Sequence, residues 1–361
     1  MPPPLNLFDL EAAARELLPA ATYAYYAGGA GDEITLRENV AAFARLALRP
    51  RVMRDVSRRD VTTTVLGHAL DLPVLVAPMA FQSLAHPEGE LAVARAARAA
   101  GSLMVLSTLA TTAVEEVQAA APGPLWFQLY VYKDRGATQA LVERAERAGC
   151  TALVLTADTP YLGRREGDVR NAFTLPPELS IGNVVPGGPT TLPEAYAESG
   201  LAVYVASLIE AALSWRDVEW LRTVTRLPVL VKGVLRGDDA RRAVEHGAAG
   251  VIVSNHGGRQ LDTAVATIRA LPEVAEALAG AGAGAEILLD GGVRRGTDVV
   301  KALALGARAV LLGRPVLWGL TLDGEAGAAR TLAMLRAELE LAMSLCGCAH
   351  LSEVTGDLIA P

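Results

Sequence analysis

The chain has 361 residues and a net charge of −7; 51% of its residues are hydrophobic and only 5% are aromatic. The negative charge argues against binding to nucleic acid or to a membrane surface, and no apolar run reaches the roughly 18–20 residues of a membrane span. This hydrophobic but aromatic-poor composition predicts a core of Ala, Val and Leu, as in parallel sheets covered by helices.

The cysteines and the N-terminal segment favour a cytoplasmic location. Cys150, Cys346 and Cys348 give an odd count, which indicates reduced thiols and no disulfide framework. Residues 1–4 read Met-Pro-Pro-Pro, without the basic and apolar regions of a signal peptide. The sequence therefore predicts a cytoplasmic protein.

The N-terminal part has the patterns of two helices and a hairpin. Residues 9–18 predict an amphipathic helix with Asp9 as its N-cap, and a second helix is expected over 35–46. The Tyr-rich and Gly-rich segment 23–31 between them is interpreted as a turn. Residues 61–71 predict a β-hairpin.

From residue 73 onward, short apolar runs alternate with helical segments rich in Ala, Arg and Glu. Eight such units in one chain predict a closed (β/α)8 barrel. The alternative is an open doubly wound sheet, which usually carries a Gly-x-Gly-x-x-Gly loop where Met79-Ala80-Phe81-Gln82 stands here. The apolar runs cover residues 73–77, 103–106, 125–129, 152–156, 228–232, 250–253, 286–289 and 309–312.

We expect a single domain over residues 1–361, with N-terminal helices and a hairpin over 1–72, the barrel over 73–322 and a C-terminal helix over 323–361. A long interval after the fourth strand breaks the regular alternation, and its stretch 176–201 is rich in Pro and Gly. Long irregular loops in compact domains are usually functional or disordered. We interpret this stretch as a flexible lid at the catalytic mouth, with disorder without function as the alternative.

The segment after the sixth strand, Ser254-Asn255-His256-Gly257-Gly258-Arg259, carries the strongest chemical signal. Active sites of such barrels lie at the C-terminal ends of the strands. His256 offers a base with a pKa near neutrality, and Arg259 offers a fixed, charged fork for a carboxylate. A base beside an anion-binding group suits chemistry on the carbon next to a carboxylate.

Polar or small residues also follow the other strands. After the last two strands, glycines combine with Arg294 and Arg314, which predicts a phosphate site. Lys232 at the end of the fifth strand could be a Schiff-base nucleophile or a fixed charge, and the fixed charge is favoured beside a phosphate-bearing ligand and a separate His base. No pair of histidines has the spacing of a metal site. The remaining strand-end residues are Pro78, Met79, Ala80, Ser107, Gln128, Tyr130, Thr156, Asp158, Arg165, Asp290, Gly291, Gly292 and Gly313.

The chain resembles the FMN-dependent (S)-2-hydroxy-acid oxidase/dehydrogenase family over essentially its whole length. The resemblance is carried by long strings such as FQLYVYKDR (127–135), LGRRE (162–166), SNHGGRQLD (254–262) and LDGGVRRGTDVVKALALGA (289–307). It implies a (β/α)8 barrel with an N-terminal helical extension and bound FMN. It also implies a small 2-hydroxy acid as substrate, O2 as acceptor, and assembly as a homotetramer or homo-octamer.

The resemblance assigns roles residue by residue. His256 would be the catalytic base and Asp158 would stabilise its protonated form. It leaves open whether His256 removes the hydroxyl proton during hydride transfer or the α-proton to give a carbanion. The substrate would contact Tyr25, Arg165, Arg259, Tyr130, Leu109 and Met79. FMN would contact Pro78, Met79, Ala80, Ser107, Gln128, Thr156, Lys232, Ser254, Asp290, Gly291, Gly292, Arg294, Gly313 and Arg314.

Two departures from glycolate oxidases concern the substrate. Those enzymes typically carry Trp at the position of Leu109 and Thr at the position of Met79. The smaller Leu109 enlarges the pocket beside the second carbon of the substrate, and Met79 adds a pliable apolar wall. We therefore expect L-lactate to be preferred over glycolate, with larger hydroxy acids also admitted.

Other functions remain as alternatives. A soluble dehydrogenase that passes electrons to a quinone or a cytochrome would share the same site, and so would a glycolate oxidase. A phosphate-binding barrel without redox chemistry, such as an aldolase, would share only the phosphate signal. A flavin-binding protein that has lost catalysis would not be expected to keep His256, Arg165, Arg259 and Tyr130 together.

Overall fold

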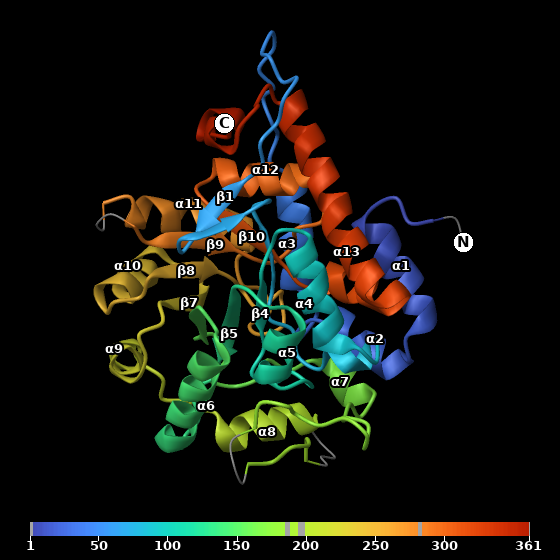
Figure 1. Cartoon of the computed structure of the whole chain (residues 1–361), viewed down its shortest axis with the longest axis vertical. Coiled ribbons are helices and arrows are strands. Elements are labelled where there is room, and N and C mark those ends of the chain that lie inside the picture. Colours follow the sequence, from blue (N-terminus) through green and yellow to red (C-terminus); the bar gives the residue numbers. More distant parts are fainter. Residues whose placement is uncertain (1–2, 185–187, 194–198, 281–283, 361) are drawn as a thin grey trace.

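A closed barrel of eight parallel strands forms the centre of the molecule (Figure 1). The computed structural model describes residues 3–184, 188–193, 199–280 and 284–360. Around the barrel the strands follow the order β10-β3-β4-β5-β6-β7-β8-β9, which confirms the predicted (β/α)8 fold and excludes the open sheet. The strands are β3 Val74–Val76, β4 Met104–Leu106, β5 Leu125–Leu129, β6 Ala152–Thr156, β7 Val229–Val234, β8 Gly250–Val253, β9 Glu286–Leu289 and β10 Ala309–Leu312.

The strand β7 corrects one predicted boundary. The sequence places the end of this strand at Lys232, but β7 continues to Val234. The pairing of β7 with β8 shifts register between Lys232 and Val234, so β7 carries one residue more than its neighbour requires. This irregularity lies at the end of the barrel where the predicted site residues gather.

The barrel interior is filled by side chains from alternate strand positions. Leu75, Trp126, Ile252 and their counterparts on the other strands form one buried cluster. The hairpin β1 (Thr63–Val65) and β2 (His68–Leu70) contributes side chains to the same cluster, as expected for the predicted hairpin. It therefore closes the N-terminal end of the barrel, and the opposite end is left for ligands.

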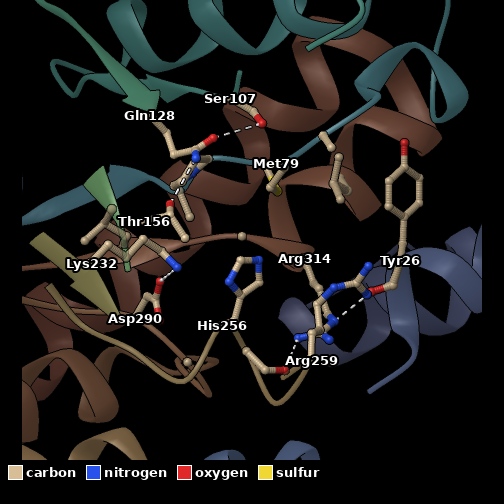
Figure 2. Close-up of a pocket in the computed structure, with 18 of the residues that line it drawn as sticks. Tyr26, Met79, Ser107, Gln128, Thr156, Lys232, His256, Arg259, Asp290 and Arg314 are labelled. Atoms are coloured by element: carbon tan, nitrogen blue, oxygen red, sulfur yellow. Dashed lines mark hydrogen bonds and ion pairs between the residues drawn. The ribbon is translucent and has the colours of Figure 1, made fainter. Parts of the chain in front are cut away.

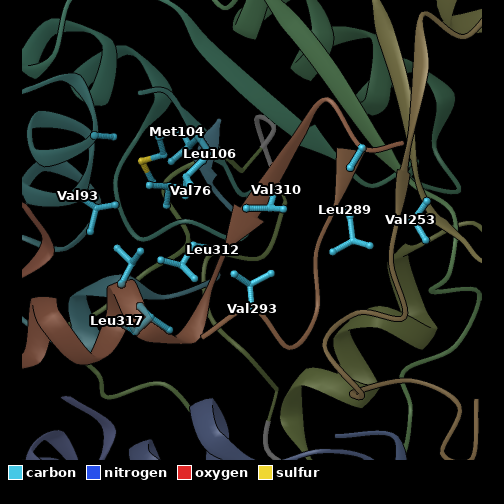
Figure 3. Close-up of a cluster of buried hydrophobic side chains, with 14 of the residues drawn as sticks. Val76, Val93, Met104, Leu106, Val253, Leu289, Val293, Val310, Leu312 and Leu317 are labelled. Carbon is cyan, nitrogen blue, oxygen red and sulfur yellow. The ribbon is translucent and has the colours of Figure 1, made fainter. Parts of the chain in front are cut away.

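The outward faces of the strands pack against the surrounding helices. Figure 3 shows part of this layer, where Val76, Val310 and Leu312 of the strands meet Val93 of α4 and Leu317 of α13. Burial on both faces explains why the strands read as continuous apolar runs. The barrel helices are α4 Gly89–Ala99, α5 Val114–Ala120, α6 Arg135–Ala148, α9 Trp215–Val224, α10 Gly237–Glu245, α11 Thr267–Leu278, α12 Gly296–Ala304 and α13 Arg314–Leu345.

The N-terminal helices differ from the prediction in two respects. Helix α1 (Leu7–Leu17) is capped by Asn6, whose side chain accepts bonds from two backbone N–H groups, so Asp9 lies in the first turn and is not the cap. The Tyr-rich segment is not a turn but helix α2 (Ala20–Ala27), because its alanines favour a helix up to the stop at Gly28. Helix α3 (Ile34–Ala44) lies close to its predicted range.

The segment α13 follows β10 and consists of two helical stretches, the second of which begins close to the expected residue 323. Asp323 and Gly324 have non-helical dihedral angles, so the helix is kinked there. It ends at Leu345, and two short 3-10 turns, Leu351–Glu353 and Gly356–Leu358, follow it. No helix within the described ranges is long and apolar enough to cross a membrane.

In its described residues, the long interval after β6 carries the short helices α7 (Glu166–Arg170) and α8 (Gly200–Leu208) ahead of the barrel helix α9. Backbone bonds from Lys133 to Leu208 and from Glu210 to Val131 fix the end of α8 beside the loop after β5. The predicted lid over 176–201 partly falls on residues 185–187 and 194–198, which lie outside the described residues.

A buried pair of amides joins the N-terminal helices to the loop after β8. The side chains of Asn39 and Asn255 exchange two hydrogen bonds of 2.8 and 2.7 Å. Asp262 of the same loop accepts bonds from the backbone N–H groups of Asp32 and Thr35. These contacts fix the loop that carries His256 against helix α3.

The substitution Asn39→Ala is expected to lower the free energy of unfolding by about 1–3 kcal/mol, because it leaves the buried amide of Asn255 without its partner. Urea unfolding followed by circular dichroism measures the change. Asn171→Ala is the matched control, since that amide is exposed. An Asn39→Ala protein as stable as the control would contradict this account of the loop.

Candidate active site

A large cavity opens at the C-terminal end of the barrel and encloses about 1090 Å³ of empty space, part of it open to solvent. Most predicted site residues line it, and Figure 2 shows them converging from several strands. They are Tyr25, Pro78, Met79, Ala80, Ser107, Leu109, Gln128, Tyr130, Thr156, Arg165, Lys232, His256, Arg259, Asp290, Gly291, Gly292, Arg294, Gly313 and Arg314.

Two predicted site residues, Asp158 and Ser254, lie behind the cavity wall. Asp158 contacts His256, and Ser254 accepts a hydrogen bond of 3.0 Å from Lys232 Nζ. The backbone N–H of His256 also donates to Ser254 Oγ, at 3.1 Å. Both residues therefore act on groups that line the cavity and do not line it themselves.

Several lining residues were missed by the sequence reasoning. Leu201 and Val205 come from α8, far along the chain from any motif, and only their place in the long loop hinted at them. Tyr26 lies next to the predicted Tyr25. Gly257, which belongs to the predicted segment around His256, also lines the cavity. The others are Ala77, Leu162, Val293, Leu311, Leu312 and Leu317.

His256 has an unusual backbone conformation and a carboxylate partner. Its φ of 59° is in the left-handed region, which non-glycine residues seldom adopt. Nδ1 of the ring lies 2.9 Å from Asp158 Oδ1, which leaves Nε2 for the cavity. Burial lowers the pKa of His256 although Asp158 opposes the shift, so the ring is neutral at pH 7. Burial alone would raise the pKa of Asp158, but His256 and Lys232 together hold it below its ordinary value.

Lys232 is a buried, fixed positive charge. Its Nζ lies 3.4 Å from Asp290 Oδ2 and donates to Ser254. Burial alone would lower the pKa of Lys232, but the charges of Asp290 and Asp158 outweigh it and raise the pKa. The ammonium group is therefore charged at neutral pH, which argues against a nucleophilic amine.

Four buried or partly buried guanidinium groups surround the cavity with few anionic partners. Burial, then the neighbouring Arg259, lowers the pKa of Arg165 to about 10. The same two causes lower the pKa of Arg314 to about 9. Asp168 lies 3.9 Å from Arg165, and no other carboxylate of the described chain forms an ion pair with these four arginines. The site therefore has unbalanced positive charge that anionic ligands would neutralise.

Arg294 lacks a hydrogen-bond partner for part of its guanidinium group among the described residues. It is buried, its Nη1 donates to the carbonyl of the adjacent Val293, and its Nε has no hydrogen-bond partner in the described part of the chain. Arg314, by contrast, donates to the carbonyls of Tyr26, Gly257 and Gly28. Arg294 can therefore hold an oxygen anion directly, whereas Arg314 contributes mainly charge.

A chain of hydrogen bonds orders one wall of the cavity. Gln128 Nε2 donates to Thr156 Oγ1 at 3.0 Å, and its Oε1 accepts from the Ser107 hydroxyl and the Thr108 backbone N–H. These bonds fix which end of the amide faces which neighbour. The wall thus presents oriented polar groups, suited to the edge of a flat heterocycle.

Apolar side chains occupy another part of the lining. Met79 follows β3, Leu109 follows β4, and the other three, Leu162, Leu201 and Val205, lie in the long interval after β6. Their presence near His256 and Arg259 makes this region suitable for an uncharged substrate side chain. No cluster of three metal-binding side chains occurs among the residues that the structure describes.

Residues 14–361 match the model of a family described as FMN-dependent dehydrogenase. The chain belongs to this family. It is 55% identical to the L-lactate oxidase of Nostoc sp. over 97% of this chain and 96% of that protein. It is also 55% identical to glycolate oxidase 1 of Zea mays, over 97% and 94% of the two chains. A crystal structure of mandelate oxidase with (S)-4-hydroxymandelic acid superimposes with a TM-score of 0.93 and 44% identity, covering 99% of this chain and 98% of that one.

The cofactor of this family is FMN, and the cavity suits it. The unpartnered Nε of Arg294 provides a donor for a phosphate. Gly291 and Gly292 have φ values of 88° and 91°, a backbone conformation that few other residues adopt. Because neither residue has a side chain, a ligand can approach the backbone closely there. The polar wall of Gln128, with Lys232, matches a flat ring that carries hydrogen-bonding edges.

The substitution Arg294→Met is expected to weaken FMN binding about 10–100-fold, the loss of one charge-assisted hydrogen bond. Fluorescence titration of the apoprotein with FMN measures the dissociation constant. Arg295→Met is the control, because the neighbouring Arg295 pairs with Glu338 and does not line the cavity. Equal affinity in the two variants would show that Arg294 does not hold the cofactor.

Proposed function

We propose that the protein oxidises (S)-2-hydroxy acids to 2-oxo acids with FMN and O2, releasing hydrogen peroxide, and that it prefers L-lactate. The observation that carries this proposal is the convergence of a partly buried base, His256, and two arginines suited to a carboxylate, Arg165 and Arg259, on the cavity that suits FMN. The oxidase names of its relatives in Nostoc sp. and Zea mays support it.

The substrate carboxylate binds between Arg165 and Arg259. The guanidinium of Arg259 lies over the ring of Tyr25 at 5.0 Å and donates to the carbonyls of Tyr25 and Gly28, which restricts its orientation. Tyr25 in turn stacks on Phe173, with ring centroids 4.0 Å apart. A carboxylate held by pre-ordered groups has its α-carbon in one place, and such positioning supplies about 7–11 kcal/mol of barrier reduction.

Proton removal belongs to His256 and Asp158. Nε2 of the neutral imidazole accepts a proton from the substrate, and the adjacent carboxylate stabilises the positive ring that results. Burial, then the charge of Asp158, raises the pKa of Tyr130, so its hydroxyl stays protonated and donates to the substrate oxygen. FMN, when bound, supplies the two-electron acceptor and passes the electrons to O2.

The preference for L-lactate rests on the apolar part of the cavity. Leu109 is only 4% exposed and stands with Met79, Leu162, Leu201 and Val205 where a substrate side chain would lie. A methyl group buried there gains about 1–3 kcal/mol over hydrogen. Glycolate, which lacks a side chain, leaves this space unfilled.

Assembly and location are part of the proposal. We propose a homotetramer or homo-octamer in the cytoplasm, on the resemblance to the family and on the three cysteines, all of which are buried and free. Light scattering of the purified protein would test the assembly.

The substitution His256→Ala is expected to keep FMN bound but slow anaerobic flavin reduction by L-lactate about 10²–10⁴-fold, because the base is gone. Stopped-flow absorbance at the flavin band measures the rate. His246→Ala is the control, since His246 pairs with Glu219 on the surface. Reduction at the normal rate without His256 would remove it from this role.

The substitution Leu109→Trp is expected to lower the L-lactate to glycolate ratio of kcat/KM about 10-fold, because the indole fills the space for the methyl group. Steady-state oxygen uptake with each acid measures the ratio. Leu345→Trp, at an exposed position on α13, is the control. An unchanged or higher ratio would place the selectivity outside Leu109.

A further inference from the structure

The contact between Asp158 and His256 joins two loops whose strands are separated by a third strand. Asp158 follows β6 and His256 follows β8, and β7 lies between these strands in the barrel. Neighbouring strands are about 4.8 Å apart, so the two strand ends are separated by about 10 Å. The 2.9 Å contact between the side chains therefore forms over the end of β7.

The space for this contact lies at the end of β7, where Gly233 has no side chain. The register shift between Lys232 and Val234 makes Gly233 the extra residue of the strand, with a φ of 105°. A Cβ atom at Gly233 would lie 2.5 Å from Cβ and 2.7 Å from Cγ of Asp158. Both distances are far below van der Waals contact, so any side chain at this position would displace the carboxylate.

Hydrogen bonds alone do not fix the carboxylate of Asp158. Oδ1 accepts a bond from the Thr159 hydroxyl and contacts His256, whereas Oδ2 has no hydrogen-bond partner in the ranges described. The orientation of the group therefore depends on what it packs against, and the surface beneath it is the bare backbone of Gly233.

The side chain of Gln260 forms a second connection between the same two loops. Gln260, from the loop after β8, donates through Nε2 to the carbonyls of Asp158 at 2.7 Å and Tyr161 at 2.9 Å. Its Oε1 accepts from the backbone N–H of Gly163 at 3.0 Å. One side chain thus ties the loop that carries Asp158 to the loop that carries His256.

We propose that Gly233 is a positioning residue for catalysis, because the absence of a side chain there allows Asp158 to reach over the end of β7 to His256. Gln260 holds the two loops in this arrangement. The inference rests on the proposed roles of Asp158 and His256. It predicts that a side chain at Gly233 harms catalysis only through Asp158.

The decisive experiment is a double-mutant cycle on the rate of anaerobic flavin reduction with L-lactate, using FMN-loaded Gly233→Ala, Asp158→Ala and the double variant. Asp158→Ala is expected to slow reduction about 100-fold and Gly233→Ala about 10-fold or more. The double variant should be no more than about 3-fold slower than Asp158→Ala, because residues that act through one contact are not additive.

Gly306→Ala is the matched control. Gly306 has a φ of 108°, nearly that of Gly233, and its added Cβ would lie 2.8 Å from Ala275 Cβ. It follows α12 and precedes β10, at the end of the barrel opposite the cavity. Backbone strain of the same kind is therefore expected to lower thermal stability there and to leave the reduction rate within about 2-fold.

The pH profile gives a readout that a purely structural role would not move. Asp158 raises the pKa of His256, whereas burial, Lys232 and Arg165 lower it. Displacement or removal of the carboxylate lowers the pKa of His256 further. The acidic limb of the pH profile of kcat/KM is therefore expected to shift to lower pH in Gly233→Ala and in Asp158→Ala. The limb should stay in place in Gly306→Ala.

Each outcome decides one claim. Losses that multiply in the double variant would overturn the proposal, because Gly233 would then act through another group such as Lys232. An Asp158→Ala enzyme of normal rate would instead refute the proposed function of Asp158 itself. If Gly233→Ala does not fold, adding Asp158→Gly removes the two side-chain atoms that collide with the new Cβ and leaves only the backbone nitrogen of Asp158, at 2.9 Å. The second substitution is then expected to recover part of the lost stability, and no recovery would overturn the proposal.

The role of Gln260 is tested in the same way. Gln260→Ala is expected to slow flavin reduction about 10-fold and to shift the acid limb in the same direction. Its effect should largely vanish in the Asp158→Ala background. An unchanged rate, or fully additive losses, would exclude Gln260 from positioning Asp158.

Discussion

The excess of buried positive charge at the open end of the barrel is the constraint on which the rest of the site depends. Arg165, Arg259, Arg294 and Arg314 are held in a space that supplies few counter-charges. Burial of unpaired charge is costly unless a ligand completes the pairing. Under the proposed function, the cofactor phosphate and the substrate carboxylate would supply the missing negative charges, and both would lie in one cavity with His256.

Backbone carbonyl groups, more than carboxylate side chains, supply the hydrogen-bond partners of these arginines. Carbonyl groups at the end of α2 accept bonds from Arg259 and Arg314, so the N-terminal helices are part of the site and not an appendage. The amide pair of Asn39 and Asn255 holds those helices against the loop that carries His256. The positions of the base and of the anion-binding groups are thus coupled.

The sequence predicted the barrel strands well because strands buried on both faces read as short apolar runs between Gly-terminated helices. It missed α2, since a Tyr-rich segment before glycines resembles a turn until its burial is known. It also missed Leu201 and Val205, because a helix in a long loop carries no local signal of what it packs against. Ser254 was found by its place after the sixth predicted strand, but only the folded structure shows that it lies behind the cavity wall.

The most direct test of the account is oxygen uptake by the FMN-loaded protein with L-lactate, with peroxide measured in the same reaction and glycolate at equal concentration for comparison. We expect rapid oxygen uptake with L-lactate, one peroxide formed per lactate, and a slower reaction with glycolate. Faster turnover of glycolate would contradict the assignment of the apolar part of the cavity. A protein that binds FMN but consumes no oxygen with either acid would contradict the central claim that this cavity is the site of a hydroxy-acid oxidase.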